Sequence, residues 1–457
     1  MPLDPAGRKV GMYCCGPTVY DYGHIGNFRT FTFGDLVRRY LEFRGYQVTH
    51  VMNITDVEDK IIRRVAETGR TLEEYTRSYE NAFLDDSRLL NLLPPHVRPR
   101  ATEHVREIVD LIAQLVDRGI AYKTADGSVY FSIQKYEEAG RKYGQLLNLN
   151  FDGMRTVDRV RNDEYAKESV ADFALWKARV PEDGGVFWPS PWGEGRPGWH
   201  IECSAMGIKH LGASFDLHLG GEDLIFPHHE DEIAQSEGAC CHKPGERFVK
   251  YWVHASHLKV EGEKMSKSLG NFFTLRDLLA KGYQGREVRY LLLGAHYRDT
   301  FNFTLEGLSG ARSALARIDD CLRRLRETAA GAAAEPDPLL VEKFTASMDE
   351  DLNISAAWGA VFDWVRDCNR KLADGSMTRE AAASAVAAWQ RLDTVLGLDS
   401  TSAAEEAPAE IVALMDGRQA ARKARDFAMA DQIRNELKSK GWVVEDTPKG
   451  PRLKRIG

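Results

Sequence analysis

The feature that most constrains the fold is a strand, a helix and a second strand in close succession near the N-terminus. Val10 to Cys15 is a short apolar run that ends at Gly16-Pro17. A helix is predicted from about Asn27 to Arg44, and Gly45 ends it. A second strand is predicted from about Tyr46 to Ile54. A helical crossover of this length joins parallel strands, so the sequence predicts an α/β domain with a parallel sheet.

The pattern then breaks and resumes. Residues 102–118 have the apolar spacing of an amphipathic helix, and residues 120–196 contain short strand-like pieces and a turn-rich stretch. The α/β pattern returns with a strand at Phe215–Leu219, a helix from about Pro227, and a strand from about Tyr251 to Val260. We interpret residues 120–196 as an insertion that interrupts the sheet domain.

The C-terminal third of the chain is predicted to be helical. From about residue 303 the sequence is Ala-rich, and residues 331–338 and 399–408 have linker composition. The predicted organisation is a first half of the sheet domain (1–119), a connective insertion (120–196), a second half (197–302), a helical bundle (303–398) and a small C-terminal domain (409–457). Thr274 and Asp277 have the spacing of a capping box that opens a helix.

Charge is distributed unevenly along the 457 residues. The chain has 61 Lys and Arg against 68 Asp and Glu, a formal net charge of −7. Residues 417–457 carry eleven basic and five acidic residues, a net charge of +6, which leaves −13 for the remaining 416 residues. This asymmetry predicts a polyanion-binding end on an acidic body.

The composition also bears on location. No apolar run approaches the roughly 18 residues that a membrane helix needs, and the N-terminus lacks the apolar core of a signal peptide. Seven cysteines are an odd and low count for a disulfide scaffold. We therefore expect a cytoplasmic protein with no membrane partner. The composition does not reveal the oligomeric state, and a monomer is a separate expectation.

The first motif with chemical potential is His24-Ile25-Gly26-Asn27, between the first strand and the helix. A helix N-terminus collects unpaired N–H groups that suit a phosphate, and glycine lets the backbone approach it. A plain turn is an equally good interpretation of this tetrapeptide alone.

The second motif is Lys264-Met265-Ser266-Lys267-Ser268, followed by Gly270. Two lysines can neutralise the charge of a triphosphate in a transition state, and two hydroxyl groups can donate hydrogen bonds to it. Taken alone, the motif is better explained as a solvated basic turn. The sequence contains neither a P-loop nor a GxGxxG fingerprint after a strand.

A third set could bind a metal ion: Cys15, Cys203, His228 and Glu232. His228 and Glu232 are four apart on a predicted helix and so share one face. His229, three residues from Glu232, could replace His228. A Zn²⁺ ion accepts sulfur, nitrogen and oxygen ligands together. Spacing alone favours the simpler interpretation of two core cysteines and a surface His/Glu pair.

Together these motifs closely resemble the cysteinyl-tRNA synthetase family of class I aminoacyl-tRNA synthetases. The resemblance covers nearly the whole chain, and its longest runs are MYCCGPTVYDYGHIGN (12–27), NITDVEDK (53–60), GWHIECSAM (198–206), GEDLIFPHHEDEIAQSE (221–237) and EKMSKSLGNFFTLRDLL (263–279). It implies a Rossmann-like catalytic domain interrupted by an insertion, then an α-helical bundle and a C-terminal anticodon-binding domain.

The resemblance also assigns roles to residues. It implies one Zn²⁺ per chain, bound by Cys15, Cys203, His228 and Glu232. It places Thr55, Trp199 and Asp223 in the amino-acid pocket, with His200 and His218 near its floor. It places His24, Gly26, Asn27, Lys264, Ser266 and Lys267 at ATP, with His24, Lys264 and Lys267 catalytic.

The implied reaction joins L-cysteine to ATP, releases pyrophosphate, and transfers the cysteinyl group to the 3′ end of tRNA(Cys), with Mg²⁺ accompanying ATP. Zinc would select the cysteine thiolate over the serine hydroxyl. Three features depart from the family pattern: Asn27 stands where histidine is more usual, Leu219 where glycine is expected, and the stretch before the first strand is short.

One alternative has the same adenylate chemistry. An ATP-dependent ligase that joins cysteine to a small amino-sugar, of the mycothiol-pathway type, would share the zinc set and both motifs. Such an enzyme has no use for the basic C-terminal segment, which therefore favours tRNA as the acceptor. A non-catalytic tRNA-binding relative would be expected to lack part of the set of lysines and metal ligands that this chain retains.

Overall fold

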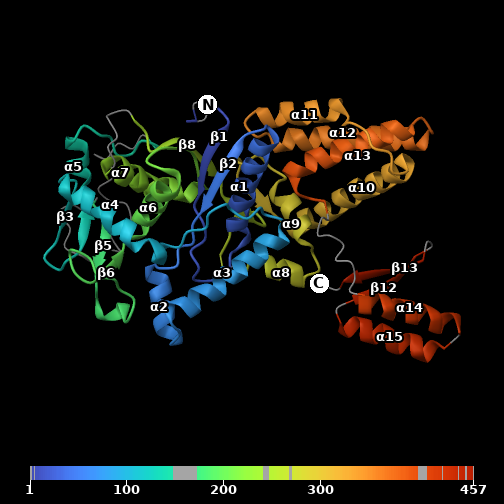
Figure 1. The fold of residues 1–457 in the computed structure, drawn as a ribbon, viewed down its shortest axis with the longest axis horizontal. Helices are drawn as coiled ribbons and strands as arrows, with labels where there is room; N and C mark the ends of the chain where they lie inside the picture. The colour runs from blue at the N-terminus through green and yellow to red at the C-terminus, as the bar shows by residue number, and fades with distance from the viewer. Residues whose placement is uncertain are drawn as a thin grey trace. The chain divides into compact units, whose positions relative to one another are not determined.

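The computed structural model describes residues 3–4, 6–147, 172–239, 246–266, 270–399, 409–424, 426–440, 442–447 and 450–455. The chain forms two compact units, Met1–Gly397 and Leu398–Gly457 (Figure 1). Within the described ranges, no helix is both long enough and apolar enough to cross a membrane.

The first unit is built around a four-stranded parallel sheet. Its order is β2-β1-β7-β8, and each neighbouring pair is parallel. Helix α1 (Ile25–Phe43) makes the crossover between the first two strands. The strands are β1 (Lys9–Cys14), β2 (Gln47–Met52), β7 (Phe215–Gly221) and β8 (Val249–Ala255). The parallel α/β sheet predicted from the sequence is confirmed.

Between β2 and β7 the chain forms helices and a second sheet. The helices are α2 (Asp59–Thr68), α3 (Leu72–Leu89), α4 (Val105–Asp117), α5 (Ile133–Glu138) and α6 (Trp199–Leu211). The second sheet is antiparallel, with the order β3-β4-β5-β6. Its strands are β3 (Ala121–Lys123), β4 (Val129–Phe131), β5 (Phe173–Ala178) and β6 (Gly195–Pro197). Within the first unit, this sheet and the helical bundle lie on opposite sides of the parallel sheet (Figure 1).

The strand predicted from Tyr251 to Val260 is in fact two strands in different sheets. Strand β8 ends at Ala255, and β9 (Leu258–Val260) pairs with β10 (Glu263–Lys264) and β11 (Phe301–Phe303). The break has a distant cause, since Glu222 accepts hydrogen bonds from Ser256 Oγ at 2.7 Å and from the His257 N–H at 3.3 Å. These contacts turn the chain out of the parallel sheet.

Helices dominate the remainder of both units. Thr274 and Asp277 form the predicted capping box at the start of α8. The helices of the first unit are α7 (Glu230–Ala239), α8 (Leu275–Ala280), α9 (Gly285–Leu292), α10 (Leu305–Ala329), α11 (Pro338–Asp349), α12 (Ile354–Ala373) and α13 (Arg379–Leu396). The second unit contains α14 (Ala409–Lys423), α15 (Phe427–Ser439) and an antiparallel hairpin of β12 (Trp442–Thr447) and β13 (Gly450–Arg455). Ile411, Leu437 and Trp442 form its core.

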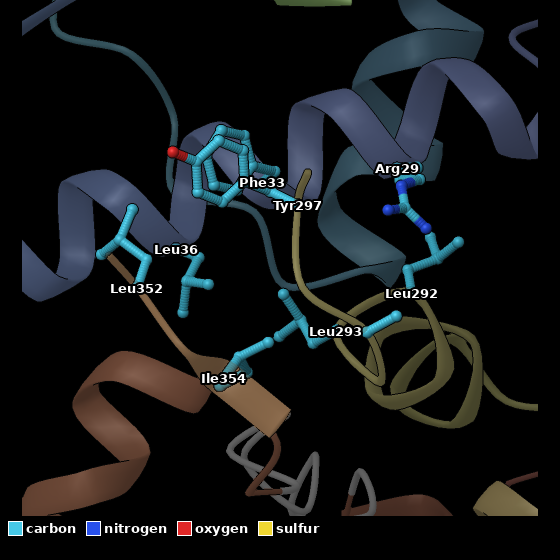
Figure 2. Close-up of a pocket in the computed structure, with 9 residues that line it drawn as sticks. Arg29, Phe33, Leu36, Leu292, Leu293, Tyr297, Leu352 and Ile354 are labelled. Atoms are coloured by element: carbon cyan, nitrogen blue, oxygen red, sulfur yellow. The ribbon is translucent and has the colours of Figure 1, made fainter. Parts of the chain in front are cut away.

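A small cavity lies between α1, the end of α9 with the segment that follows it, and the start of α12 (Figure 2). Its volume is about 10 Å³, enough for about one water molecule. Most of its lining is apolar, and the Arg29 guanidinium donates to the carbonyl oxygens of His296 and Asp299, at 3.2 and 2.6 Å. The cavity is too small for a nucleotide or an amino acid, so the functional site lies elsewhere.

Candidate functional site

Four side chains from separate segments converge at the carboxyl end of β1. Cys15 directly follows β1, Cys203 lies on α6, His228 precedes α7, and Glu232 lies in the first turn of α7. All four are buried, and their candidate ligand atoms lie within 4.8 Å of one another. His228 Nε2 is 3.1 Å from Glu232 Oε1. The structure therefore brings together the four residues that the sequence proposed as metal ligands.

The local backbone explains this convergence. The Cys15 N–H donates to the Leu219 carbonyl at 3.0 Å, which extends the pairing of β1 with β7 up to the cysteine. The helix predicted from Pro227 begins three residues later, at Glu230, and His228 lies in the irregular turn before it. Leu219, the second departure from the family pattern, is a buried core residue of β7. Its side chain packs in the sheet rather than beside the cluster.

A second donor set overlaps the first. Cys15, His218, His229 and Glu232 also place their candidate ligand atoms within 4.8 Å of one another. His218 Nε2 lies 3.0 Å from Glu232 Oε2, and His229 Nε2 lies 3.4 Å from Cys15 Sγ. The two sets share Cys15 and Glu232. The geometry alone thus leaves the choice between His228 and His229 open.

The electrostatics of the first set suit a cation. A hydrogen bond from Cys15 lowers the pKa of the Cys203 thiol to about 6. Burial acts to raise the pKa of Glu232, but His218 and His228 hold it at about 2. Burial acts to lower the pKa of His228, but hydrogen bonds with Cys203 and Glu232 raise it to about 10.

These shifts describe two buried acids that favour their anionic forms. The compensating charge is a proton on His228, and a divalent ion would supply the same charge. Two sulfurs, one imidazole nitrogen and one carboxylate oxygen are a donor set that zinc accepts. Thiolate and carboxylate are also the forms that bind metal. The residues present therefore fit a zinc ion.

The three predicted amino-acid-pocket residues lie near strand ends. Trp199 is the first residue of α6, and its ring centroid is 4.5 Å from that of His228. The Trp199 side chain is 37% exposed, so it lies beside the buried cluster and is itself accessible to solvent. Thr55 follows β2 and is buried, and its Oγ accepts from Asn53 Nδ2 at 3.1 Å.

Asp223 is exposed, in a short turn after β7. Gly221 makes room for its carboxylate, because a Cβ at Gly221 would lie 2.4 Å from Asp223 Oδ1. A side chain at position 221 would therefore displace the acid.

The first motif forms the start of α1. Asn27 N–H donates to His24 Nδ1 at 3.2 Å, and His24 N–H donates to Asn27 Oδ1 at 3.1 Å. This reciprocal capping box uses the asparagine where a glutamate or glutamine is more common. Asn27 therefore has a structural role that the sequence analysis missed, although the three-residue spacing was a signal for it.

The two motifs contact each other. A Cβ at Gly26 would lie 3.0 Å from the His24 ring and 3.3 Å from Met265 Cε, so the absence of a side chain lets the second motif approach the first. The Ile25 N–H donates to the Phe273 carbonyl at 3.0 Å, which joins α1 to the segment after the second motif.

Asn271 holds the second motif in place. Its Oδ1 accepts from the Ser266 N–H at 2.8 Å, and its Nδ2 donates to the Lys264 carbonyl at 3.2 Å. Lys264 is exposed. Lys267, proposed as catalytic, lies outside the described residues. The sequence analysis did not single out Asn271, because its role in holding the second motif depends on how the loop folds back.

Comparison with known proteins assigns the chain. The family model of the class I (C) tRNA synthetase catalytic domain matches residues 3–313, the DALR domain matches 343–400, and the cysteinyl-tRNA ligase anticodon-binding domain matches 404–451. The chain is 46% identical to a cysteine–tRNA ligase of Chlamydia felis (strain Fe/C-56), over 99% of this chain and 94% of that one. It is also 46% identical to the enzyme of that name from Chlamydia muridarum (strain MoPn / Nigg), over 99% and 96%.

Solved structures agree on the fold. Mycobacterium tuberculosis methionyl-tRNA synthetase in complex with methionyl-adenylate aligns with a TM-score of 0.63 at 16% identity, covering 86% of this chain and 92% of that one. The Agrobacterium radiobacter K84 LeuRS in its ternary complex aligns with a TM-score of 0.61 at 12% identity, covering 86% and 85%. The fold, the convergent motifs and the near full-length matches lead to one conclusion: the chain belongs to the cysteine–tRNA ligase family of class I aminoacyl-tRNA synthetases.

Proposed function

We propose that the chain activates L-cysteine with ATP, transfers the cysteinyl group to the 3′ end of tRNA(Cys), and selects cysteine through a metal centre formed by Cys15, Cys203, His228 and Glu232. The observation that carries this proposal is the buried S, S, N, O cluster beside Trp199, at the edge of the sheet from which α1 also starts. Ligands of open α/β sheets bind at this carboxyl edge.

The ATP would be held where the two motifs meet. The α1 N-terminus presents backbone N–H groups, and its helix dipole favours phosphate. The contact between Gly26 and Met265 places the second motif against that terminus. The ammonium groups of Lys264 and Lys267 would neutralise charge on the departing pyrophosphate, with Ser266 as a further donor. Mg²⁺ would accompany ATP and neutralise further phosphate charge.

The cysteine would enter past Trp199. When bound, Zn²⁺ supplies a Lewis-acid contact that favours a thiolate over a hydroxyl. Trp199 would cover the substrate side chain, and Asp223 would pair with its α-ammonium group. Thr55, held by Asn53, would contribute a hydroxyl to the pocket. A site built to hold sulfur in this way can reject serine by roughly 10⁴–10⁵ without a hydrolytic editing domain.

The acceptor would be tRNA. The net charge of +6 in residues 417–457 suits a phosphate backbone, and the matched anticodon-binding domain at 404–451 supports tRNA over an amino-sugar. We place this activity in the cytoplasm, where a reducing environment keeps Cys15 and Cys203 as thiols, and in a monomer.

The test is cysteine-dependent ATP–pyrophosphate exchange followed by charging of tRNA(Cys) by the purified, zinc-loaded chain. We expect exchange with serine to be at least about 10³-fold slower than with cysteine. Comparable exchange rates for the two amino acids would refute selection by the sulfur-binding cluster. Exchange without tRNA charging, together with cysteine ligation to an amino-sugar, would establish the alternative ligase.

A further inference from the structure

A buried arginine joins the helix of the first motif to the part of the chain that supports the second motif. Arg29 lies on α1, two residues after Asn27, and only 3% of its surface is exposed. Its Nη2 donates to the carbonyl oxygens of Asp299 at 2.6 Å and of His296 at 3.2 Å. Both acceptors belong to the segment between α9 and β11. Because a guanidinium is costly to bury without partners, these bonds hold that segment against α1.

Two ring contacts strengthen the same junction. The Tyr297 ring stacks on the Phe33 ring of α1, with 4.5 Å between their centroids, and Figure 2 shows the two rings beside each other. The Arg29 guanidinium lies 5.0 Å from the ring centroid of Phe301, the first residue of β11. The face of an aromatic ring attracts a guanidinium. Arg29 therefore contacts β11 itself as well as the segment before it.

Strand β11 is the base of the hairpin that carries Lys264. It pairs with β9, and β9 pairs with β10, whose last residue is Lys264. The turn of the hairpin is also attached to β11, since Asn302 Oδ1 accepts from the Gly262 N–H at 2.7 Å. A displacement of β11 would therefore move Lys264.

Helix α1 holds the second motif on both sides of Lys264. On one side, the hairpin rests on β11, which Arg29 attaches to α1. On the other side, Met265 approaches α1 at Gly26, where a side chain would obstruct it. The position of Lys264 relative to the start of α1 thus depends on two separate attachments to one helix.

We propose that Arg29 is a positioning residue for adenylate formation, which sets the place of Lys264 relative to the N-terminus of α1. This inference rests on the proposed function, in which that terminus and Lys264 both act on the phosphates of ATP. Arg29 is buried, so it acts through β11 and the hairpin. Neutralisation of developing charge requires donors in fixed places, and a displacement of about 1 Å can lower a rate by about 10²-fold.

The experiment measures cysteine-dependent ATP–pyrophosphate exchange by the full-length, zinc-loaded chain and its variants, per active site. In Arg29→Met we expect kcat to fall by about 10²-fold, while KM for cysteine changes by less than about threefold, because the candidate metal cluster is unaltered. Arg29→Lys can still donate to the Asp299 carbonyl, so it should recover part of kcat. Asn302→Ala frees the hairpin turn at an exposed position and should lower kcat by about 10-fold in the same pattern.

Arg38→Met is the matched control. Arg38 is a second buried arginine of α1, and its Nη1 donates to the Pro94 carbonyl at 2.7 Å, in the segment that follows α3. Its loss removes a contact between α1 and the main chain, as Arg29→Met does, but leaves β11 attached. We expect a lower unfolding temperature in both variants and an unchanged kcat only in Arg38→Met.

Three results would overturn the proposal: a fall in kcat in Arg38→Met as large as in Arg29→Met, an unchanged kcat in both Arg29→Met and Asn302→Ala, or a loss confined to KM for cysteine. If Arg29→Met does not fold, Asn302→Ala decides, and an unchanged kcat in it refutes the role of the hairpin attachment. Absence of cysteine-dependent exchange in the unmodified chain would instead refute the proposed function, and this inference with it.

Discussion

Replacing Cys203 by serine should distinguish the two overlapping donor sets. Cys203 belongs only to the set with His228, and His229 only to the set with His218, while Cys15 and Glu232 are common to both. Cys203→Ser and His229→Asn therefore each remove a donor from one set and leave the other complete. Both changes keep a polar side chain of similar size in the buried cluster.

The expected magnitude follows from the donor set. Structural sites with four ligands bind zinc with a free energy of about 10–16 kcal/mol, so one ligand accounts for roughly 3–4 kcal/mol. Cys203→Ser should therefore lower the zinc affinity by about 10²–10³-fold. A serine hydroxyl would not replace a thiol whose pKa Cys15 lowers to about 6. His229 Nε2 lies 3.4 Å from Cys15 Sγ. If His229 only neighbours the ligand set, His229→Asn should lower the zinc affinity by about 10–100-fold.

The assay is competition with a chelator, combined with cobalt substitution. The set with Cys203 has two thiolates and the set with His229 has one, so sulfur-to-cobalt charge-transfer absorbance counts the sulfurs directly. We expect this absorbance to fall by about half in Cys203→Ser and to persist in His229→Asn. Unchanged absorbance and zinc affinity in Cys203→Ser would refute the assignment, as would a larger loss of affinity in His229→Asn.

Four further predictions concern stability, acid dependence, catalysis and tRNA. Arg289 is fully buried and contacts Asp35 at 2.6 Å. Arg289→Met should therefore lower the free energy of unfolding by about 3–5 kcal/mol in urea titrations, because it leaves a buried carboxylate without this partner. Arg286→Met is the control: Arg286 pairs with the partly exposed Asp319, and its loss should cost under about 1 kcal/mol. Burial acts to raise the pKa of Asp35, but Arg289 and Arg39 hold this pKa below its usual value. The ionised Asp35 therefore stabilises the fold fully above a pH of about 3.9, and this stabilisation is lost as the pH falls through the lower pKa of the folded state. An Asp35→Asn variant should lose the part of the acid dependence of unfolding that Asp35 causes. Lys267→Ala should lower the adenylation rate more than ATP affinity in rapid-mixing kinetics, and a loss confined to affinity would contradict a transition-state role. Removing residues from 409 onward should leave pyrophosphate exchange nearly intact but cripple tRNA charging; unchanged charging across two salt concentrations would exclude a tRNA-binding role for this unit.

The elements that local sequence determines were predicted well. The alternation of strand and helix near the N-terminus is sufficient for the parallel pairing of β1 and β2, since a crossover of that length admits little else. The helix predicted at 102–118 is observed as a short 3₁₀ turn followed by α4. It could be predicted because its apolar spacing selects one buried face. Capping by Thr274 likewise depends only on residues three apart.

Contacts that form only in the folded chain explain one wrong strand boundary and one missed role. No pattern near Ala255 indicates that β8 ends there, because the end depends on Glu222, more than thirty residues earlier in the chain. Asn271 fixes the second motif by folding back on Lys264 and Ser266, which only the loop conformation reveals.

The candidate metal cluster shows why residue spacing cannot by itself identify ligands. Helical spacing puts His228 and Glu232 on one face, yet His228 lies before α7 and reaches Glu232 through an irregular turn. That turn also brings His229 to Cys15, and both lie near Glu232 Oε1, the same oxygen that His228 contacts. A buried carboxylate with two oxygens can thus face a histidine on each side, at 3.1 Å from His228 and 3.0 Å from His218. The number of sulfur donors then distinguishes the two sets, since Cys203 joins Cys15 in only one of them. Zinc binds well to thiolates, so we expect the set with two cysteines to hold the ion and the histidines of the other set to be its neighbours.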